Sequence, residues 1–274
     1  MRILRICTCA AFAVILAVFL FFYIREERNT DATWPVITIE EQLIDVSLRP
    51  TGEELMKGIT AYDGKDGDIT EKLVVESISR FTEPGISTVT YAVCDSDQHV
   101  SVAARKIRYI GYTSPQFYMN RSLVFSVAEL PDIGSVLGAK DSIDGDVSDR
   151  IIITASDYAS NTIGVFSISA QVSNSKGDTI YLDLPVYIED ISAAAPKITL
   201  SEYLVCLEAG EAFDPAAYLD SAAAGDGTEL TAAVWTESSL DSNTEGVYSV
   251  HYYVTDSAGR QGHTVLTVLI ENTK

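Results

Sequence analysis

The chain has 274 residues and a formal net charge of −20 at pH 7. So acidic a surface repels nucleic acid and anionic lipid headgroups, and no nucleic-acid partner is expected. The cysteines do not indicate a disulfide framework. Cys94 and Cys206 lie in different parts of the chain, and we expect both to be buried free thiols.

An apolar segment near the N-terminus is the first predicted element. Residues 6–24 carry no charge and, at 1.5 Å per residue, are long enough to cross roughly 30 Å of hydrocarbon. We therefore predict a transmembrane signal-anchor helix over residues 6–24, a cytoplasmic N-terminus over residues 1–5 and a linker over residues 25–33. The alternative is a cleaved signal peptide and a secreted chain, which the missing small-x-small cleavage site disfavours.

The charged residues beside this segment predict its orientation. Arg2 and Arg5 precede it, whereas Arg25 and Arg28 after it are interleaved with glutamates. An excess of basic residues marks the cytoplasmic side of a membrane. We therefore expect a single-pass protein of the cell membrane, with its N-terminus inside and its C-terminal domains extracellular.

A phrase of one glycine followed by alternating apolar and polar residues occurs three times, at intervals of about 80 residues. The copies begin at Gly85, Gly164 and Gly246, to which we assign a structural role. The interval is too long for a solenoid unit and is typical of a string of small domains. The predicted domains, named repeats 1, 2 and 3 below, are residues 34–112, 113–190 and 195–272.

Each repeat has the pattern of short β-strands. Residues 89–93 and 248–254 alternate apolar and polar side chains, which buries one face of a strand. Turn signals separate such runs at intervals of about 8 to 12 residues, as in a β-sandwich. We predict an all-β fold of three tandem β-sandwich domains after one N-terminal transmembrane helix, with short helical turns at residues 53–57 and 214–219.

Three local motifs resemble one known family. They are Asp66-Gly-Asp-Ile-Thr70, Gly246-Val-Tyr-Ser-Val-His-Tyr252 and Asp256-Ser-Ala-Gly259. Together they look like the immunoglobulin-like repeats of bacterial surface proteins, over residues 34–272. The resemblance implies immunoglobulin-like domains, an extracellular setting and no enzymatic activity. Tyr248 then matches the tyrosine corner of that fold, whose hydroxyl bonds to the backbone a few residues upstream.

The three copies of the repeat are unequal. Repeat 1 departs from the turn motif at Gln98, which stands in the glycine position, and residues 174–177 of repeat 2 are a degraded copy. Repeat 3 keeps the turn and Tyr248, and it also contains Trp235. We therefore expect repeat 3 to make any specific contact and the other two repeats to act as spacers.

Acidic loops recur at one predicted end of the sandwiches. If these loops converge, their carboxylates could bind calcium, which takes six to eight oxygen ligands. Plain turn chemistry is the favoured alternative, because Asp side chains hydrogen-bond to local backbone and Gly permits positive φ. No other cofactor is expected. The candidate calcium ligands are Asp63, Asp66, Asp68, Asp95, Asp97, Asp141, Asp144 and Asp146.

The sequence offers no constellation of residues for catalysis, so we do not expect an enzyme. The histidines are His99, His251 and His263, and none has a metal-ligand spacing. His251 and His263 fall on consecutive predicted strands and are expected to be neighbours across the ladder. We interpret them as solvated strand residues rather than as a zinc site.

These patterns favour a membrane-anchored extracellular bacterial surface protein whose domains, joined in series by short linkers, act as a spacer or adhesion module. At typical domain size the three domains would form a rod of roughly 100 Å. The alternative is a module that binds cell-wall glycan or a protein and that calcium could stiffen. Four aromatic residues near the first junction could form its platform, although we expect them to pack between domains. They are Tyr109, Tyr112, Phe117 and Tyr118.

Overall fold

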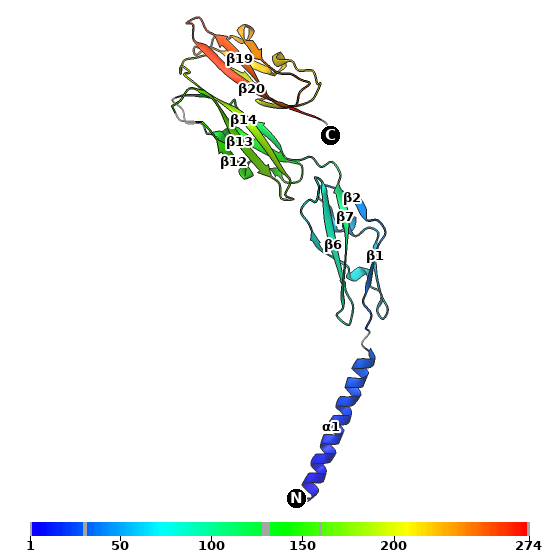
Figure 1. Ribbon diagram of the computed structural model, residues 1–274. Coiled ribbons are helices and arrows are strands. Elements are labelled where there is room, and N and C mark those ends of the chain that lie inside the picture. The colour runs from blue at the N-terminus through cyan, green and yellow to red at the C-terminus, as the bar shows by residue number, and fades with distance from the viewer. Residues whose placement is uncertain (1, 30–31, 128–131, 159–160, 273–274) are drawn as a thin grey trace. The chain divides into compact units, whose positions relative to one another are not determined.

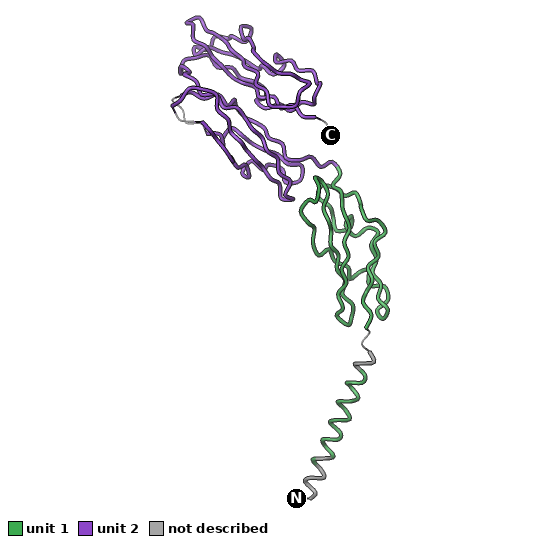
Figure 2. Tube along the Cα trace, viewed as in Figure 1, with its two compact units in different colours: residues 1–110 green, residues 111–274 purple. Residues whose placement is uncertain are grey.

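In the computed structural model the described residues are 2–29, 32–127, 132–158 and 161–272 (Figure 1). Apart from the N-terminal helix and a few short helical turns, their regular structure consists of β-strands, as predicted. The chain divides into two compact units, residues 1–110 and 111–274 (Figure 2). Repeat 1 lies in the first unit except for its last two residues, and repeats 2 and 3 together form most of the second.

The N-terminal helix α1 runs from Arg2 to Asn29 and contains the whole predicted segment 6–24. Its large apolar side chains between Phe12 and Ile24 are 45–67% exposed. The described side chains of this helix are those of Thr8 and residues 10–25. Within these described residues, no helix is long and apolar enough to cross a membrane. The transmembrane part of the prediction is therefore not confirmed.

Repeat 1 consists of two sheets, with the strand orders β1–β3–β4 and β2–β7–β6–β5. Side chains alternate along β6, where Val89, Tyr91 and Val93 are buried and their neighbours face outward. This alternation gives each sheet one apolar face for the core. The strands are β1 (Val36–Ile39), β2 (Leu43–Val46), β3 (Ile59–Asp63), β4 (Gly67–Asp68), β5 (Val74–Ile78), β6 (Ile86–Cys94) and β7 (Val100–Tyr109).

Repeat 2 has the same plan, with the strand orders β11–β10–β8 and β12–β13–β14–β9. Phe117 from the first sheet and Ile168 and Leu184 from the second belong to one buried cluster, so the two sheets pack face to face. The elements are β8 (Gln116–Met119), β9 (Val124–Ser126), α3 (Ile133–Val136), β10 (Leu137–Asp141), β11 (Gly145–Asp146), η2 (Ser148–Arg150), β12 (Ile152–Ser156), β13 (Gly164–Ser173) and β14 (Thr179–Glu189).

Repeat 3 has the strand orders β15–β17 and β16–β20–β19–β18. Ile198 and Ala222 from the first sheet share a buried cluster with Tyr252 and Leu266 from the second, which again indicates a sandwich. The elements are β15 (Lys197–Leu200), β16 (Leu204–Glu208), η3 (Pro215–Tyr218), β17 (Leu219–Ala223), η4 (Thr231–Ala233), β18 (Trp235–Ser238), β19 (Gly246–Thr255) and β20 (Gln261–Glu271).

The helical turns predicted at 53–57 and 214–219 are present as α2 (Gly52–Met56) and η3. A capping box at Thr51 begins α2, which explains why so short a helix forms there. Both turns accept a hydrogen bond from a buried tyrosine of the opposite sheet. The Tyr91 hydroxyl donates to a carbonyl of α2 at 2.7 Å, and the Tyr252 hydroxyl donates to a carbonyl of η3 at 2.8 Å.

One strand early in each repeat pairs in parallel with the last strand of that repeat. β2 pairs with β7, β9 with β14 and β16 with β20. The chain therefore crosses from one sheet to the other near its entry into each repeat. This pairing depends on contacts distant in sequence, and local patterns do not predict it.

Repeats 2 and 3 contact each other through the outer faces of their larger sheets. The Tyr187 hydroxyl of β14 donates to Ser249 Oγ of β19 at 2.8 Å. The backbone N–H of Val265 in β20 donates to Ser122 Oγ at 3.0 Å. Val265 and Thr267 are each 2% exposed, although they alternate with the residues of β20 that line the core. Repeats 2 and 3 are therefore held together by a contact between their sheets in addition to the predicted short linker.

Both predicted thiols are free, but neither is buried. Cys94 ends β6 and Cys206 lies in β16, at positions that point away from the core. The prediction of buried thiols is wrong because strand alternation places both side chains on outer faces.

Candidate functional site

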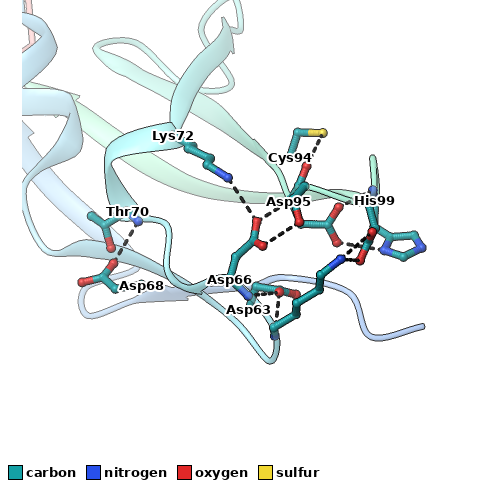
Figure 3. A network of polar contacts seen from close by, with 11 residues as sticks. Asp63, Asp66, Asp68, Thr70, Lys72, Cys94, Asp95 and His99 are labelled. Atoms are coloured by element: carbon teal, nitrogen blue, oxygen red, sulfur yellow. Dashed lines mark hydrogen bonds and ion pairs between the residues drawn. The ribbon is translucent and has the colours of Figure 1, made fainter. Parts of the chain in front are cut away.

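The acidic loops of repeat 1 meet at one end of the sandwich, as predicted, and Figure 3 shows their contacts. Asp66 accepts hydrogen bonds from the backbone N–H of Ser96 at 2.8 Å and from its hydroxyl at 2.6 Å. Lys72 Nζ lies 3.1 Å from the same carboxylate. The Ser96 hydroxyl, followed by Lys72, lowers the pKa of Asp66 to about 2. Asp66 therefore connects two loops that are 30 residues apart in the chain.

Asp63 and Asp68 serve turns within the first loop. Asp63 Oδ1 accepts from the backbone N–H groups of Lys65 and Asp66 at 2.9 and 2.8 Å. Asp68 Oδ1 accepts from the N–H of Thr70 at 2.9 Å, at the start of the helical turn η1 (Thr70–Lys72). The hydroxyl and the backbone of Thr70 lower the pKa of Asp68. Both side chains therefore accept hydrogen bonds from nearby backbone N–H groups, the usual role of Asp in a turn.

The second loop of repeat 1 has its own internal bonds. Asp95 Oδ1 accepts from the backbone N–H of His99 at 2.8 Å, and Asp95 Oδ2 lies 2.8 Å from His99 Nδ1. Asp97 pairs with Lys65 Nζ of the first loop at 2.7 Å. Gln98 has a φ of +70°, a left-handed conformation that favours glycine. This confirms that Gln98 occupies a glycine position.

Repeat 2 reproduces this network with substituted partners. Asp144 accepts from the backbone N–H and the hydroxyl of Ser175, both at 2.7 Å, and pairs with Arg150. Asp146 accepts from the backbone N–H and the hydroxyl of Ser148 at 2.9 and 2.6 Å. These Ser148 bonds lower the pKa of Asp146. The acidic motif therefore makes the same loop bridge and the same turn cap in both repeats.

The entry segment of repeat 2 is bonded to the same loops. Asp141 Oδ2 accepts from Asn174 Nδ2 at 3.0 Å, and Asn174 Nδ2 also donates to the Tyr112 hydroxyl at 2.9 Å. The Tyr112 hydroxyl in turn donates to Asp178. Burial, together with Asp178, raises the pKa of Tyr112. These bonds fix the start of repeat 2 onto its own acidic end.

Within described residues 195–272, repeat 3 has no hydrogen bond like those that bridge the two loops in the other repeats. Gly227 stands where Asp66 and Asp144 make the bridge, and Ala224 stands at the position of Asp63 and Asp141. Asp226 Oδ1 accepts from the backbone N–H of Thr228 at 3.0 Å, which lowers the pKa of Asp226. Asp256 keeps the turn role through the N–H of Arg260 at 2.9 Å and the Arg260 guanidinium at 2.7 Å. The loop chemistry has therefore diverged most in this repeat.

Nothing in this geometry requires a metal ion. Among the described residues, no group of three or more His, Cys, Asp or Glu side chains is placed to hold one. Intramolecular donors engage all eight predicted calcium ligands. Asp63 Oδ2 is buried and has no hydrogen-bond donor within the described ranges, whereas Asp141 Oδ2 accepts from Asn174. Calcium binding stays a prediction.

The residues assigned structural roles behave differently from one another. The Tyr248 hydroxyl donates to the carbonyl of Thr244 at 3.0 Å, which is the bond of a tyrosine corner. Gly85 has a φ of +76° in the turn before β6, where a side chain would be strained. Gly164 and Gly246 open β13 and β19 with a φ of +159°, and in each an aromatic ring lies 3.5 Å from the place of a Cβ atom. The three glycines are therefore not equivalent.

The four aromatic residues considered as a platform do not form an exposed surface. Tyr109 and Phe117 are buried, at 4% and 8% exposure. Tyr112 bonds to Asp178, and Tyr118 lies under Lys140 Nζ at 5.3 Å. The hypothesis of a binding platform at these residues is wrong, because Tyr109 and Phe117 are buried and Tyr112 bonds to the loops of repeat 2.

A row of stacked rings crosses the outer face of repeat 3 instead. Trp235, Tyr253 and His263 are opposite one another in the register of β18, β19 and β20. Trp235 stacks on Tyr253 and Tyr253 on His263, with ring centroids 4.5 Å apart in both pairs. Trp235 is 44% exposed. Trp235, at one end of the row, is the most exposed aromatic side chain in the described part of repeat 3.

The predicted contact between His251 and His263 is confirmed, with Nδ1 and Nε2 2.9 Å apart. His263 is not solvated as predicted, because its side chain is only 5% exposed. Tyr187 and Glu189 of repeat 2 cover this pair, with the Tyr187 ring 5.1 Å from that of His251. Sequence reasoning missed both residues. The alternation along β14 predicts which side chains face outward. It does not predict whether an outward side chain contacts water or another repeat.

Comparisons with known proteins agree with this fold. Residues 200–270 match the family described as bacterial surface protein, Ig-like domain. The chain is 28% identical over 138 residues to an uncharacterised 81.3 kDa protein of Acholeplasma phage L2, covering 49% of this chain and 18% of that protein. It is 33% identical over 130 residues to the pesticidal crystal protein Cry22Aa of Bacillus thuringiensis, covering 46% of this chain and 17% of that protein. The chain thus spans less than a fifth of the length of these relatives.

Among solved structures, the chain is similar to the M60 catalytic domain with the CBM51-1 and CBM51-2 domains of Clostridium perfringens ZmpB, at 15% identity and a TM-score of 0.26, covering 89% of this chain and 31% of that one. It is also similar to a protocadherin gammaB7 EC3-6 structure, at 12% identity and a TM-score of 0.23, covering 88% and 78% of the two chains. Scores this low support no inference about function.

Proposed function

We propose that the chain is an extracellular bacterial surface protein whose immunoglobulin-like β-sandwiches act as a spacer and adhesion module, without catalysis. The observation that carries this proposal is the match of residues 200–270 to the bacterial surface protein, Ig-like domain family. The three pairs of sheets extend the same plan over repeats 1 and 2. We therefore treat all three repeats as immunoglobulin-like domains, with the predicted boundaries 34–112, 113–190 and 195–272.

The acidic loops support a structural role rather than a chemical one. Asp66 and Asp144 each bridge two loops of one sandwich, and their partners are serine and a basic residue. Carboxylates that accept from backbone N–H groups and cations stabilise a fold but are not poised as general acids or bases. The proposal therefore assigns these loops to the rigidity of the module.

We further propose that residues 6–24 anchor the chain in the cell membrane with its N-terminus inside. The segment is uncharged and helical, and its large apolar side chains from Phe12 to Ile24 are exposed to the surroundings of the chain. A lipid environment would bury them. Carbonate-washed membranes from cells expressing the full chain should retain it, and a variant with Leu16→Arg and Phe19→Arg should be lost from them. Recovery of wild-type chain in the medium would instead indicate cleavage and secretion.

A second candidate function is recognition of a glycan or protein by repeat 3. The exposed ring of Trp235, supported from behind by Tyr253, favours it, because an aromatic face offers both apolar area and a defined geometry to a ligand. Exposed aromatic residues are also enriched at hot spots of protein interfaces.

Adhesion is tested with cells that display the full chain on surfaces coated with peptidoglycan, host-matrix protein or albumin. We expect attachment above that of cells without the chain, and loss of this gain with Trp235→Ala. Trp34→Ala is the matched control, because Trp34 is 60% exposed but lies at the start of repeat 1. Equal loss with both variants would argue against recognition by repeat 3, and no gain with the wild-type chain would argue against an adhesive role on these surfaces.

A further inference from the structure

The contact between repeats 2 and 3 contains a histidine pair. His251 of β19 and His263 of β20 lie directly across the interface from Tyr187 and Glu189 of β14. His251 Nδ1 and His263 Nε2 are 2.9 Å apart, and the rings are stacked at 5.2 Å. At this distance one nitrogen must carry a hydrogen and the other must present a lone pair. The contact therefore exists only while at least one of the two facing nitrogens is unprotonated.

The charges around the pair compensate one positive charge better than two. Glu189 Oε1 lies 2.9 Å from His263 Nδ1, an ion-pair distance without the alignment of a hydrogen bond. Two carboxylates favour a charged His251, first Glu189 and then Glu237 of β18, which is opposite His251 in the register and exposed to solvent. Arg121 and Lys197 line a groove of about 560 Å³ beside His263, and they add positive charge there.

The remaining titratable groups near the pair are phenols. Tyr187 and Tyr253 pack against the two imidazoles, and burial raises the pKa of Tyr253. Phenols in general carry no charge in the pH range where histidine titrates. They therefore exclude water from the pair but add no negative charge to balance a second proton.

We propose that the interface between repeats 2 and 3 is a pH-sensitive junction, docked while His251 and His263 share one hydrogen and released when acidification protonates both facing nitrogens. Two N–H groups would then point at each other across 2.9 Å, which removes the hydrogen bond and adds like-charge repulsion inside a contact that Tyr187 and Glu189 cover. The outer sheet faces of the two repeats would separate and expose Leu204 and Leu269 of repeat 3, which pack with the buried cluster of repeat 2, while the strands within each sandwich stay paired.

The direction of the pH effect follows from the environment of His251. Burial, and then the positive charge of His263, lowers the pKa of His251 from its usual 6.5. The docked state therefore binds fewer protons than the released state at mildly acidic pH. Docking should be fully stable above about pH 6.5 and should weaken below it, by up to tenfold in the docking constant per pH unit for one proton.

The backbone N–H of Val265 is a reporter of docking, because it donates across the interface to Ser122 Oγ at 3.0 Å. Hydrogen exchange of the full chain in detergent, followed by mass spectrometry with residue-level fragmentation, measures its protection at pH 7.5 and 5.5. After correction for the intrinsic effect of pH on exchange, we expect protection of Val265 to fall by about tenfold at the lower pH. Protection of the core strand β13 should not change. Chelator in all samples removes any contribution of metal ions.

Histidine variants decide whether the pair causes the effect. His251→Gln and His263→Gln should each abolish the pH dependence, whereas His99→Gln should keep it, because His99 pairs with Asp95 in repeat 1. A wild-type Val265 amide that is equally protected at both pH values, or unprotected at pH 7.5, would overturn the proposal. So would an unchanged pH dependence in both interface variants. If one histidine variant also loses the protection of β13, only the other histidine variant is compared with the wild type.

Discussion

Asp66 accepts two hydrogen bonds from Ser96, one from its backbone N–H at 2.8 Å and one from its hydroxyl at 2.6 Å. Asp144 and Ser175 form the same pair in repeat 2, at 2.7 Å in both bonds. An ionised carboxylate is a strong acceptor with several lone pairs. An aspartate of one loop can therefore accept several hydrogen bonds from the other loop at once. The recurrence of the acidic motif is therefore explained by the closure of one end of a sandwich.

Asp66→Ala should destabilise repeat 1. We expect the melting temperature of the first unit at pH 7 to fall by about 5 °C, since the Ser96 bonds and the Lys72 pair are lost together. The folded-state pKa of Asp66 is lowered to about 2, so its stabilisation is fully present above about pH 4 and is lost as the pH falls toward 2.

Calorimetry of the full chain between pH 2 and pH 7 measures this dependence. The difference between wild type and Asp66→Ala should shrink as the pH approaches 2. Glu76→Ala, at an exposed acid of β5, is the control and should melt like the wild type at every pH. A difference that stays constant down to pH 2 would contradict the assigned role of the ionised carboxylate.

Gln98→Gly should stabilise repeat 1 by about 1 kcal/mol, because Gln98 adopts a φ of +70° that glycine adopts without steric cost. The reciprocal change in repeat 3, Gly259→Ala at a φ of +76°, should destabilise by a similar amount. Denaturant unfolding of each full-length variant measures both effects. Destabilisation by Gln98→Gly would mean that contacts of the glutamine side chain outweigh the backbone strain.

Tyr248→Phe removes only the hydroxyl of the tyrosine corner. We expect a loss of about 1 kcal/mol of unfolding free energy in the second unit, the usual contribution of one hydrogen bond. Tyr181→Phe is the matched control, since Tyr181 is 71% exposed and should tolerate the same change. Equal unfolding midpoints for Tyr248→Phe and the wild type would show that the corner adds nothing to stability.

Calcium should have little effect if turn chemistry is the whole role of the acidic loops. We expect thermal unfolding of the full chain to give the same melting temperatures, within about 1 °C, with 1 mM calcium and with chelator, because a ligand stabilises only the state to which it binds. A rise of several degrees that Asp63→Asn abolishes would instead establish the calcium hypothesis. Asp63 suits this test because one of its oxygens is buried without a donor among the described residues.

Much of the fold follows from local patterns. The alternation of apolar and polar residues after Gly85, Gly164 and Gly246 predicts β6, β13 and β19, and burial alternates along each of them. The two short helical turns begin at a capping box and at a proline, which are also local features. The tyrosine corner at Tyr248 and the left-handed Gln98 are likewise local properties, readable because each depends on neighbours within a few residues.

The features that local patterns did not predict depend on contacts between distant residues. Arg105 is buried at 2% exposure, and its guanidinium donates to the Tyr91 hydroxyl and the Leu55 carbonyl, 14 and 50 residues away. The interface of repeats 2 and 3 brings Tyr187 to His251 in the same way. For the acidic loops the ambiguity is chemical, because an Asp that caps a turn and an Asp that binds calcium occur in the same Asp- and Gly-rich sequences.

We propose that the three repeats lie outside the cell. This claim is tested most directly by adding an epitope after Lys274 of the full chain and probing intact bacterial cells with antibody and with protease. The claim predicts that antibody labels the epitope on unbroken cells and that protease removes it, while a cytoplasmic marker protein stays intact. Labelling and cleavage that appear only after the cells are lysed would contradict it.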